Sequence, residues 1–145
     1  MTRAAPSSIA LLSIHPRFAR RILEGKKRVE FRKRGFGRAV THVVVYATQP
    51  VGRVVGFFTV KRVSIATPRS LWADYCSVGG IGGDEFWRYY QGKSEGCAIE
   101  VADVWALERP IPLGDLGSMG APQSFAYLSL RQFAVVRDAK HLPAA

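Results

Sequence analysis

The first apolar stretch of the chain is short and continuous. Residues 9–14 read Ile-Ala-Leu-Leu-Ser-Ile, which is typical of a buried strand. Pro16 then occupies the first position of a predicted helix over residues 16–24, where proline is tolerated because that N–H has no partner within the helix. Phe18 and Ile22 fall on one face of this helix, arginines project elsewhere, and Gly25 ends it. The chain therefore opens with a strand and an amphipathic surface helix.

A charged alternation follows the helix. Residues 27–34 predict an extended strand in which Val29 and Phe31 pack on one face and charged side chains share the other. The charged side chains are Arg28, Glu30, Arg32 and Arg34. Residues 41–48 and 54–63 are rich in Val, Phe and Tyr, and they predict two strands joined by a short turn. These two strands are expected to supply much of the core.

Two short helices are predicted in the second half of the chain. Thr67 is a suitable N-cap for a helix that runs through Tyr75. Asp84 is the expected cap of the next helix, which has an aromatic apolar side. Glycines follow both segments and are expected to end both helices.

The remaining elements complete a mixed fold. Residues 97–107 predict a strand, residues 122–128 a turn that leads into a helix, and residues 132–136 a last strand. Five to seven strands in this order imply an α+β fold, with a small curled sheet or β-barrel and short helices packed at one side. We expect a single domain, residues 1–145, with a core over about residues 9–136.

Composition agrees with a folded domain. The 145 residues are 48% hydrophobic and 22% charged, the mixture of a globular protein rather than of a disordered tail. The two cysteines, Cys76 and Cys97, form no metal-binding pattern, so we expect no zinc site, no disulfide framework and no cofactor. The apolar run at residues 9–14 is too short for a signal or membrane segment. A cytoplasmic protein without membrane association is expected.

Positive charge is concentrated in the first half of the chain. The formal net charge is +10. Residues 1–62 hold 14 Lys or Arg and two acids, a net of +12, whereas the remainder holds seven bases and nine acids, a net of −2. A general bias toward basic residues would spread the charge evenly. The asymmetry therefore indicates a surface that binds a polyanion, most simply nucleic acid.

The basic half contains the pattern GxKxxExR, formed by Gly25, Lys27, Glu30 and Arg32. Lys27 and Arg32 supply cationic donors, and Glu30 can orient Arg32 or accept a hydrogen bond from a base amino group. Alternatively, Glu30 and Arg32 form a solvated ion pair of little energetic worth. Other cations nearby are candidate phosphate contacts, or a charged edge that prevents strand pairing. These cations are Arg17, Arg20, Arg21, Lys26, Arg28, Lys33, Arg34 and Arg38.

The motif, at the end of a helix and the start of a strand, resembles that of the ASCH domain family in the PUA-like superfamily. The order of later strands and short helices, and the segment Pro122-Gln123-Ser124, add to a resemblance that covers about residues 9–128. The resemblance implies a PUA-like β-barrel with a cleft between barrel and helices. That cleft is expected to hold RNA or a nucleotide-sized ligand, with the motif lining it.

Aromatic and polar side chains complete the predicted site. Exposed rings beside cations can stack bases, at about 1–3 kcal/mol each. Tyr89 and Tyr127 are the best candidates, because most other rings are expected to pack in the core. Gln123 and Ser124 can read a base edge, or cap the turn that follows. We therefore expect a base or phosphate of single-stranded RNA or DNA to lie in a basic cleft.

Two other classes of function stay open. Some ASCH-like proteins are amidohydrolases of acylated cytidine and others are ribonucleases, which implies Lys27 as a base and Glu30 as an acid. Glu30 stands where the amidohydrolases have a threonine, and Asp84 or Glu85 lies only in the region of their glutamate. The third class is an adaptor that binds an acidic protein partner through the same basic face. The sequence separates neither RNA from DNA nor one oligomeric state from another.

Overall fold

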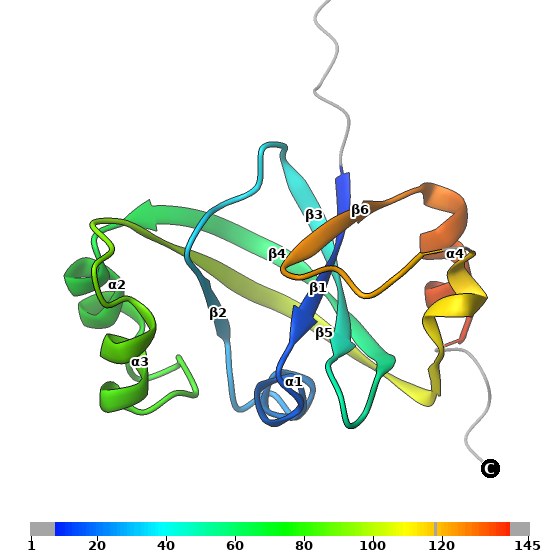
Figure 1. The fold of residues 1–145 in the computed structure, drawn as a ribbon, viewed down its shortest axis with the longest axis horizontal. Coiled ribbons are helices and arrows are strands. Elements are labelled where there is room, and N and C mark those ends of the chain that lie inside the picture. The colour runs from blue at the N-terminus through cyan, green and yellow to red at the C-terminus, as the bar shows by residue number, and fades with distance from the viewer. Residues whose placement is uncertain (1–7, 118, 140–145) are drawn as a thin grey trace, which may run out of the picture.

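The computed structural model describes residues 8–117 and 119–139 (Figure 1). Six strands, four α-helices and one 3-10 helix make up the described part. In chain order these are β1 Ser8–Ile14, α1 Pro16–Leu23, β2 Val29–Arg32, β3 Val40–Ala47, β4 Arg53–Ala66, α2 Pro68–Tyr75, α3 Gly83–Tyr89, β5 Gly96–Ile111, η1 Leu113–Leu116, β6 Phe125–Leu128 and α4 Leu130–Ala139. Within the described ranges, no helix is long and apolar enough to cross a membrane.

The six strands form one mixed sheet in the order β2-β5-β4-β3-β1-β6. Only the β1 and β3 neighbours run parallel in this sheet, and its other four pairings are antiparallel. Several register shifts interrupt the long β4 and β5 pairing, and the strands cross one another with a strong twist (Figure 1). The sheet is not closed, so β2 and β6 lie at its two edges. The predicted α+β fold with a curled sheet is confirmed.

β1 is buried on both faces, which explains its continuous apolar sequence. Leu12 faces a core cluster that contains Ile22 of α1. Leu11, the neighbouring residue, faces a second cluster that contains Phe133 and Val136 of α4. The alternation of side chains along β1 therefore fixes α1 and α4 on opposite faces of the sheet.

A third cluster attaches α2 and α3 to the β2 edge of the sheet. Phe31 of β2 contacts Phe86 of α3 edge to face, with ring centroids 5.0 Å apart. Leu71 of α2 is buried in the same cluster. Both helices lie together at one end of the molecule, and α4 lies at the other (Figure 1). This packing holds α3 beside the GxKxxExR segment.

The prediction of a last strand over residues 132–136 is wrong, because this segment lies inside α4. A reciprocal capping box begins the helix. The Gln132 amide N–H donates to the Ser129 side chain, and the Ser129 amide N–H donates to the Gln132 side chain. Phe133 and Val136 then face the sheet one helical turn apart. Residues 132–136 resemble a strand in their apolar content, but the Ser129-x-x-Gln132 pattern that begins the segment indicates a helix.

The prediction of a turn leading into a helix over residues 122–128 is wrong in its second half. Phe125–Leu128 is the strand β6, which pairs antiparallel with residues 9–12 of β1. This pairing supplies β1 with its second neighbour, more than 100 residues away in sequence. Turn-forming residues dominate the local sequence, whereas the strand depends on a long-range partner.

Three predicted boundaries also change. Asp84 is not the cap of α3; Gly82 occupies the N-cap position without a side-chain hydrogen bond, and Asp84 lies in the first turn. The extended segment predicted at residues 27–34 contributes only the four-residue strand β2, since pairing with β5 stops at Arg32. β5 is longer than predicted and continues to Ile111. Thr67 caps α2 as expected, accepting from the Ser70 amide.

Candidate functional site: a pocket above a buried lysine and glutamate

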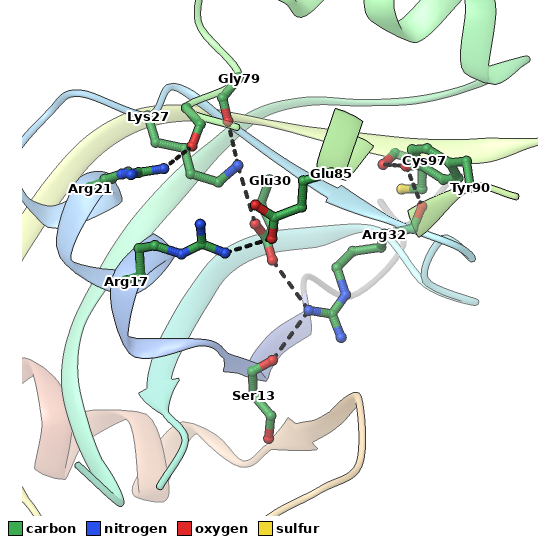
Figure 2. Close-up of polar contacts among 11 residues, drawn as sticks. Ser13, Arg17, Arg21, Lys27, Glu30, Arg32, Gly79, Glu85, Tyr90 and Cys97 are labelled. Atoms are coloured by element: carbon green, nitrogen blue, oxygen red, sulfur yellow. Dashed lines mark hydrogen bonds and ion pairs between the residues drawn. The ribbon is translucent and has the colours of Figure 1, made fainter. Parts of the chain in front are cut away.

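A pocket of about 180 Å³ lies where α1, β2 and α3 approach the end of β1. The GxKxxExR residues supply its charged groups, and apolar and aromatic side chains supply most of the remainder. Its lining residues are Ile14, His15, Phe18, Lys27, Glu30, Phe31, Arg32, Ile81 and Tyr89. Figure 2 shows the polar contacts that hold this region together.

Lys27 is the most deeply buried charged residue of the pocket, with 1% of its surface exposed. Gly25 ends α1 at a φ of +78°, and the chain then turns so that Lys27 precedes β2. The Lys27 ammonium donates to the Gly79 carbonyl oxygen and lies over the rings of Phe18 and Phe31, 5.0 and 5.3 Å from their centroids. Burial lowers the pKa of Lys27 from its usual 10.5, and the nearby Glu30 carboxylate opposes that shift.

Glu30 is also buried, with 5% of its surface exposed. Its Oε1 lies 3.7 Å from Lys27 Nζ, and its Oε2 lies 3.2 Å from Arg32 Nη1. The alternative of a solvated Glu30–Arg32 ion pair is therefore wrong. The cause is the curl of the sheet, which turns this face of β2 toward the end of β1 rather than toward water.

Arg32 joins the two edges of the open sheet. From β2, its guanidinium donates to the Ser13 carbonyl of β1, at 3.2 Å (Figure 2). It also donates to Ser124 Oγ just before β6, at 2.7 Å. The same guanidinium contacts Glu30. Side-chain hydrogen bonds thus span a gap that backbone pairing leaves open. In the described residues, every buried side-chain nitrogen and oxygen has a hydrogen-bond partner, so the network is satisfied.

Gly79 and Gly80 support the pocket, although their sequence predicted only the end of a helix. Gly80 has a φ of +63°, and a Cβ there would lie 2.7 Å from the Lys27 Cβ. A Cβ at Gly79 would lie 2.9 Å from the Phe31 ring. The two carbonyls accept from Lys27 and Arg21 respectively. Adjacent glycines were the available signal, because they allow backbone to approach a side chain closely.

The predicted phosphate contacts divide into three groups. Six are exposed: Arg17, Arg20, Lys26, Lys33, Arg34 and Arg38. Arg17 lies over the Phe18 ring and Lys33 over the Tyr89 ring, both in the pocket lining, whereas Arg20 lines a separate apolar groove on the other side of α1. Arg21 is half-buried and donates to Gly80 O at 2.7 Å, so it supports the pocket wall. Arg28 is directed elsewhere, because its guanidinium donates to the carbonyls of Val101 and Ala102 on β5.

One contact at the rim of the pocket connects separate elements. Arg17 of α1 forms an ion pair with Glu85 of α3, with 2.5 Å between Nη2 and Oε2 (Figure 2). This pair joins the two helices that flank the pocket. The Arg17 side chain also lies over the Phe18 ring, 4.3 Å from its centroid. The entrance thus carries both a cation and an acid.

The other predicted residues take different positions. Tyr89 lines the pocket, Lys33 Nζ lies 4.8 Å from its ring centroid, and burial raises its pKa above 10.0. Tyr127 does not line the pocket; Arg38 covers its ring, and its hydroxyl accepts from the Gly37 amide. Ser124 is engaged by Arg32, while Gln123 is exposed beside it.

The chemistry available in this pocket is that of an acid and base pair with cationic support. Within the described ranges, His, Cys, Asp and Glu do not gather in groups of three or more that could hold a metal ion. Lys27 and Glu30 can donate and accept protons, and Arg32 can stabilise an anion. Apolar walls can receive a flat ring. His15, Phe18 and Ile81 belong to these walls and were not predicted as site residues.

Comparisons with known proteins agree with this architecture. An ASCH domain-containing ribonuclease of Zymomonas mobilis is 32% identical over 133 residues, which cover 88% of this chain and 89% of that protein. A crystal structure of ASCH from Zymomonas mobilis superposes with a TM-score of 0.83 at 28% identity, over 90% of this chain and 94% of that chain. The N-terminal domain of Staphylothermus marinus McrB shares the fold alone, with a TM-score of 0.55 at 11% identity over 94% of this chain and 95% of that chain.

The family comparison covers the strands and helices that build the pocket. The ASCH domain model matches residues 12–111, which include the whole GxKxxExR segment and the Gly79-Gly80 turn. The predicted family is confirmed, and this chain belongs to the ASCH domain family.

Proposed function

We propose that this domain binds single-stranded RNA, with one base in the pocket and the flanking phosphates on the exposed cations around it. The observation that carries the proposal is the joint presence of a buried Lys27, Glu30 and Arg32 network and an aromatic wall in one pocket. The name of the Zymomonas mobilis relative favours RNA over DNA as the ligand.

The size and lining of the pocket suit a single base. An apolar cavity of about 150 Å³ can hold a benzene-sized ring, and this pocket measures about 180 Å³ with polar groups at its floor. The Glu30 carboxylate has lone pairs beyond the hydrogen bond from Arg32, so it can accept from a base N–H. Tyr89 and Phe18 provide ring surfaces for apolar contact.

The rim suits a phosphate backbone. Arg17 and Lys33 are exposed and lie over Phe18 and Tyr89, two rings of the pocket lining, before and after the buried motif. Such cations attract a polyanion without reading its sequence. Single strands are favoured over duplexes, because a base must leave its stack to enter a pocket of this size.

A binding panel tests the proposal. Single- and double-stranded RNA and DNA are titrated at several salt concentrations against the wild type and the Lys33→Glu/Arg34→Glu variant. We expect single-stranded RNA to bind most tightly, with a log–log salt slope of about −0.7 for each phosphate contact, and the variant to bind more weakly at unchanged thermal stability. The matched control is Arg109→Glu/Arg131→Glu, two exposed cations at the α4 end.

Other results would contradict RNA as the ligand or replace it with another. A salt-independent profile, or equal weakening by the control variant, would contradict the RNA surface. Stronger binding to single-stranded DNA would replace RNA as the ligand. Binding to an acidic protein with no binding to any oligonucleotide would favour an adaptor.

RNA cleavage is the second candidate function, favoured by the ribonuclease name of a relative that matches 88% of this chain. In the simplest reaction the 2′-hydroxyl loses its proton and attacks the adjacent phosphorus, and the bond to the 5′-oxygen breaks as that oxygen gains a proton. Lys27, whose pKa burial lowers, and Glu30 are the candidates for these two proton transfers.

Lys27→Met and Glu30→Gln separate binding from cleavage. An arginine at position 27 is a poor probe, because the Gly80 backbone packs against the lysine stem and leaves a branched guanidinium little space. If the domain cleaves RNA, both variants should lose product formation from single-stranded RNA while measurable binding persists. Incubation with N4-acetylcytidine tests the amidohydrolase alternative in the same assay. If the wild-type protein forms no product over a wide pH range, RNA binding without catalysis stays the proposed function.

A further inference from the structure

A second groove, of about 330 Å³, lies between the segment that connects β2 to β3 and residues 60–63 of β4. Three of its lining residues are cations and none is acidic. The lining residues with charge are Arg38, Lys61 and Arg62. Neither the predicted site nor the pocket described above includes Lys61 or Arg62.

The positive charge of this groove comes mainly from Arg38 and Lys61. Arg62 forms an ion pair with Glu100, with 2.7 Å between Nε and Oε2, so its charge is largely balanced. Arg38 is exposed but held in place, because its guanidinium lies 4.2 Å from the Tyr127 ring centroid. Lys61 is exposed on β4. A guanidinium held against a ring and an exposed ammonium, lining one groove, suit the contact of a phosphate.

The groove and the pocket are joined by a short cationic segment. Arg32 lines the pocket and Phe36 lines the groove, so at most about 14 Å of extended chain separates them. Lys33 and Arg34, both exposed, lie between them. Phe36 anchors the segment against Phe125, with ring centroids 5.0 Å apart. In Figure 1 this connection arches from β2 to the start of β3.

A neighbouring groove lacks these properties. Its lining includes Lys61 and Arg28 but also the acids Glu100 and Asp103. Arg28 there is occupied by two backbone carbonyls, those of Val101 and Ala102. Arg62 balances the charge of Glu100, but Asp103 would still place a like charge beside an anion in that groove. We therefore expect an anion to favour the groove with Arg38 and Lys61.

We propose that the Arg38–Lys61 groove is a phosphate subsite for the RNA strand as it leaves the pocket. This inference rests on the proposed function, and it adds that the binding site is several nucleotides long. The ligand class is the phosphodiester backbone, contacted without reading of base sequence. Strands long enough to reach from the pocket past Lys33 and Arg34 occupy both sites.

The length of the ligand separates the two sites experimentally. A dinucleotide and a decamer of single-stranded RNA are titrated against wild type, Arg38→Gln/Lys61→Gln, and the control Arg109→Gln/Arg131→Gln. For the groove variant we expect decamer affinity to fall roughly tenfold, and its log–log salt slope to become shallower by about 0.7 for each phosphate that the variant no longer neutralises. Dinucleotide affinity, and both affinities of the control, should stay at the wild-type values.

Each remaining outcome contradicts one proposal or both. Unchanged decamer binding by Arg38→Gln/Lys61→Gln would overturn the subsite while leaving RNA binding in the pocket intact. Equal losses for dinucleotide and decamer would also overturn it, because the two cations would then act at the pocket. Absence of binding by the wild type to either RNA would overturn the proposed function together with the subsite. Thermal unfolding of the variants checks that each is folded.

Discussion

At the scale of single residues, the site depends on two opposite charges held inside the protein. Lys27 and Glu30 lie 3.7 Å apart, and each has a further polar partner, the Gly79 carbonyl and Arg32 respectively. Burying a charge costs free energy unless its partners replace water. Removing either member therefore leaves the other with less compensation.

A double-mutant cycle measures this dependence. Lys27→Met keeps much of the side-chain length and removes the charge, and Glu30→Gln keeps the shape. We expect Lys27→Met to lower the free energy of unfolding by about 3 kcal/mol. The double variant should be less destabilised than the sum of the two single variants, by about 1–2 kcal/mol. Urea denaturation provides all four values, and strictly additive effects would show that the two charges do not interact.

Cys97 gives a second residue-scale prediction, through pH. Burial raises the pKa of this thiol from 9.0 to about 11. Between these values the unfolded chain ionises while the folded protein keeps its thiol neutral, so the free energy of unfolding falls as pH rises. From pH 8 to pH 10 the wild type should lose about 1 kcal/mol that Cys97→Ala does not lose. Parallel pH dependence of the two proteins in urea denaturation would contradict this account.

At the scale of elements, the turn between α2 and α3 is as much a part of the pocket as β2 is. Its glycines bring two carbonyls to Lys27 and Arg21, two cations from the other side of the pocket. A side chain at Gly80 would need both a left-handed backbone and space already taken by the Lys27 stem. The turn, the lysine and the end of α1 therefore form one packing unit.

Gly80→Ala tests this unit. We expect a loss of about 2 kcal/mol in the free energy of unfolding, from the positive φ and the close Lys27 Cβ together. RNA binding should weaken as well, because Lys27 must shift. The control is Gly114→Ala in η1, where a Cβ would meet nothing within 4 Å, and where stability should change by less than about 0.5 kcal/mol. Equal effects at both positions would contradict a specific role for Gly80.

Elements whose local sequence determines them could be predicted, and elements that depend on distant partners could not. The strand at residues 9–14, helix α1 with its Gly25 stop, and the Thr67 cap all follow from local chemistry. β6 depends on pairing with β1, which no local pattern encodes. α4 was within reach, since its Ser129 and Gln132 capping box is visible in the sequence.

The same division applies to the candidate site. Lys27, Glu30 and Arg32 could be selected because they fall in one short motif. Their burial could not, because it results from the curl that brings β2 to the end of β1. Ser13 and Gly79 are bound to the motif through contacts between residues far apart in sequence. The position of Arg28 next to Lys27 in sequence predicts a place in the site, but its guanidinium contacts β5 outside the pocket.

At the scale of the whole molecule, the basic surface is not uniformly positive at the pocket entrance. Glu85 of α3 holds Arg17 of α1, and the pair joins the two helices beside the pocket. The Arg17 guanidinium keeps the pKa of Glu85 below its usual 4.5, so this acid is charged at neutral pH. A phosphate that approaches Arg17 must compete with Glu85. If the site binds RNA as proposed, we expect this acid to limit its affinity.

Neutralising this acid should strengthen binding. We expect Glu85→Gln to raise the affinity for single-stranded RNA about threefold at low salt, about 0.6 kcal/mol, with the gain lost at high salt. Asp84→Asn is the matched control, since it removes the same charge from the same turn of α3 without touching Arg17. Fluorescence anisotropy measures both. Weaker binding by Glu85→Gln, or an equal gain for Asp84→Asn, would contradict the competition between Glu85 and phosphate.

Mapping where RNA contacts the folded protein tests most directly whether the pocket binds RNA. In a titration of ¹⁵N-labelled protein with a short single-stranded RNA, amide chemical shifts report each residue separately. We expect the largest changes at residues 27–33, at Gly79 and Gly80, and at Tyr89, with α4 unchanged. Changes confined to α4 or to the turn between β3 and β4, or none at saturating RNA, would contradict it.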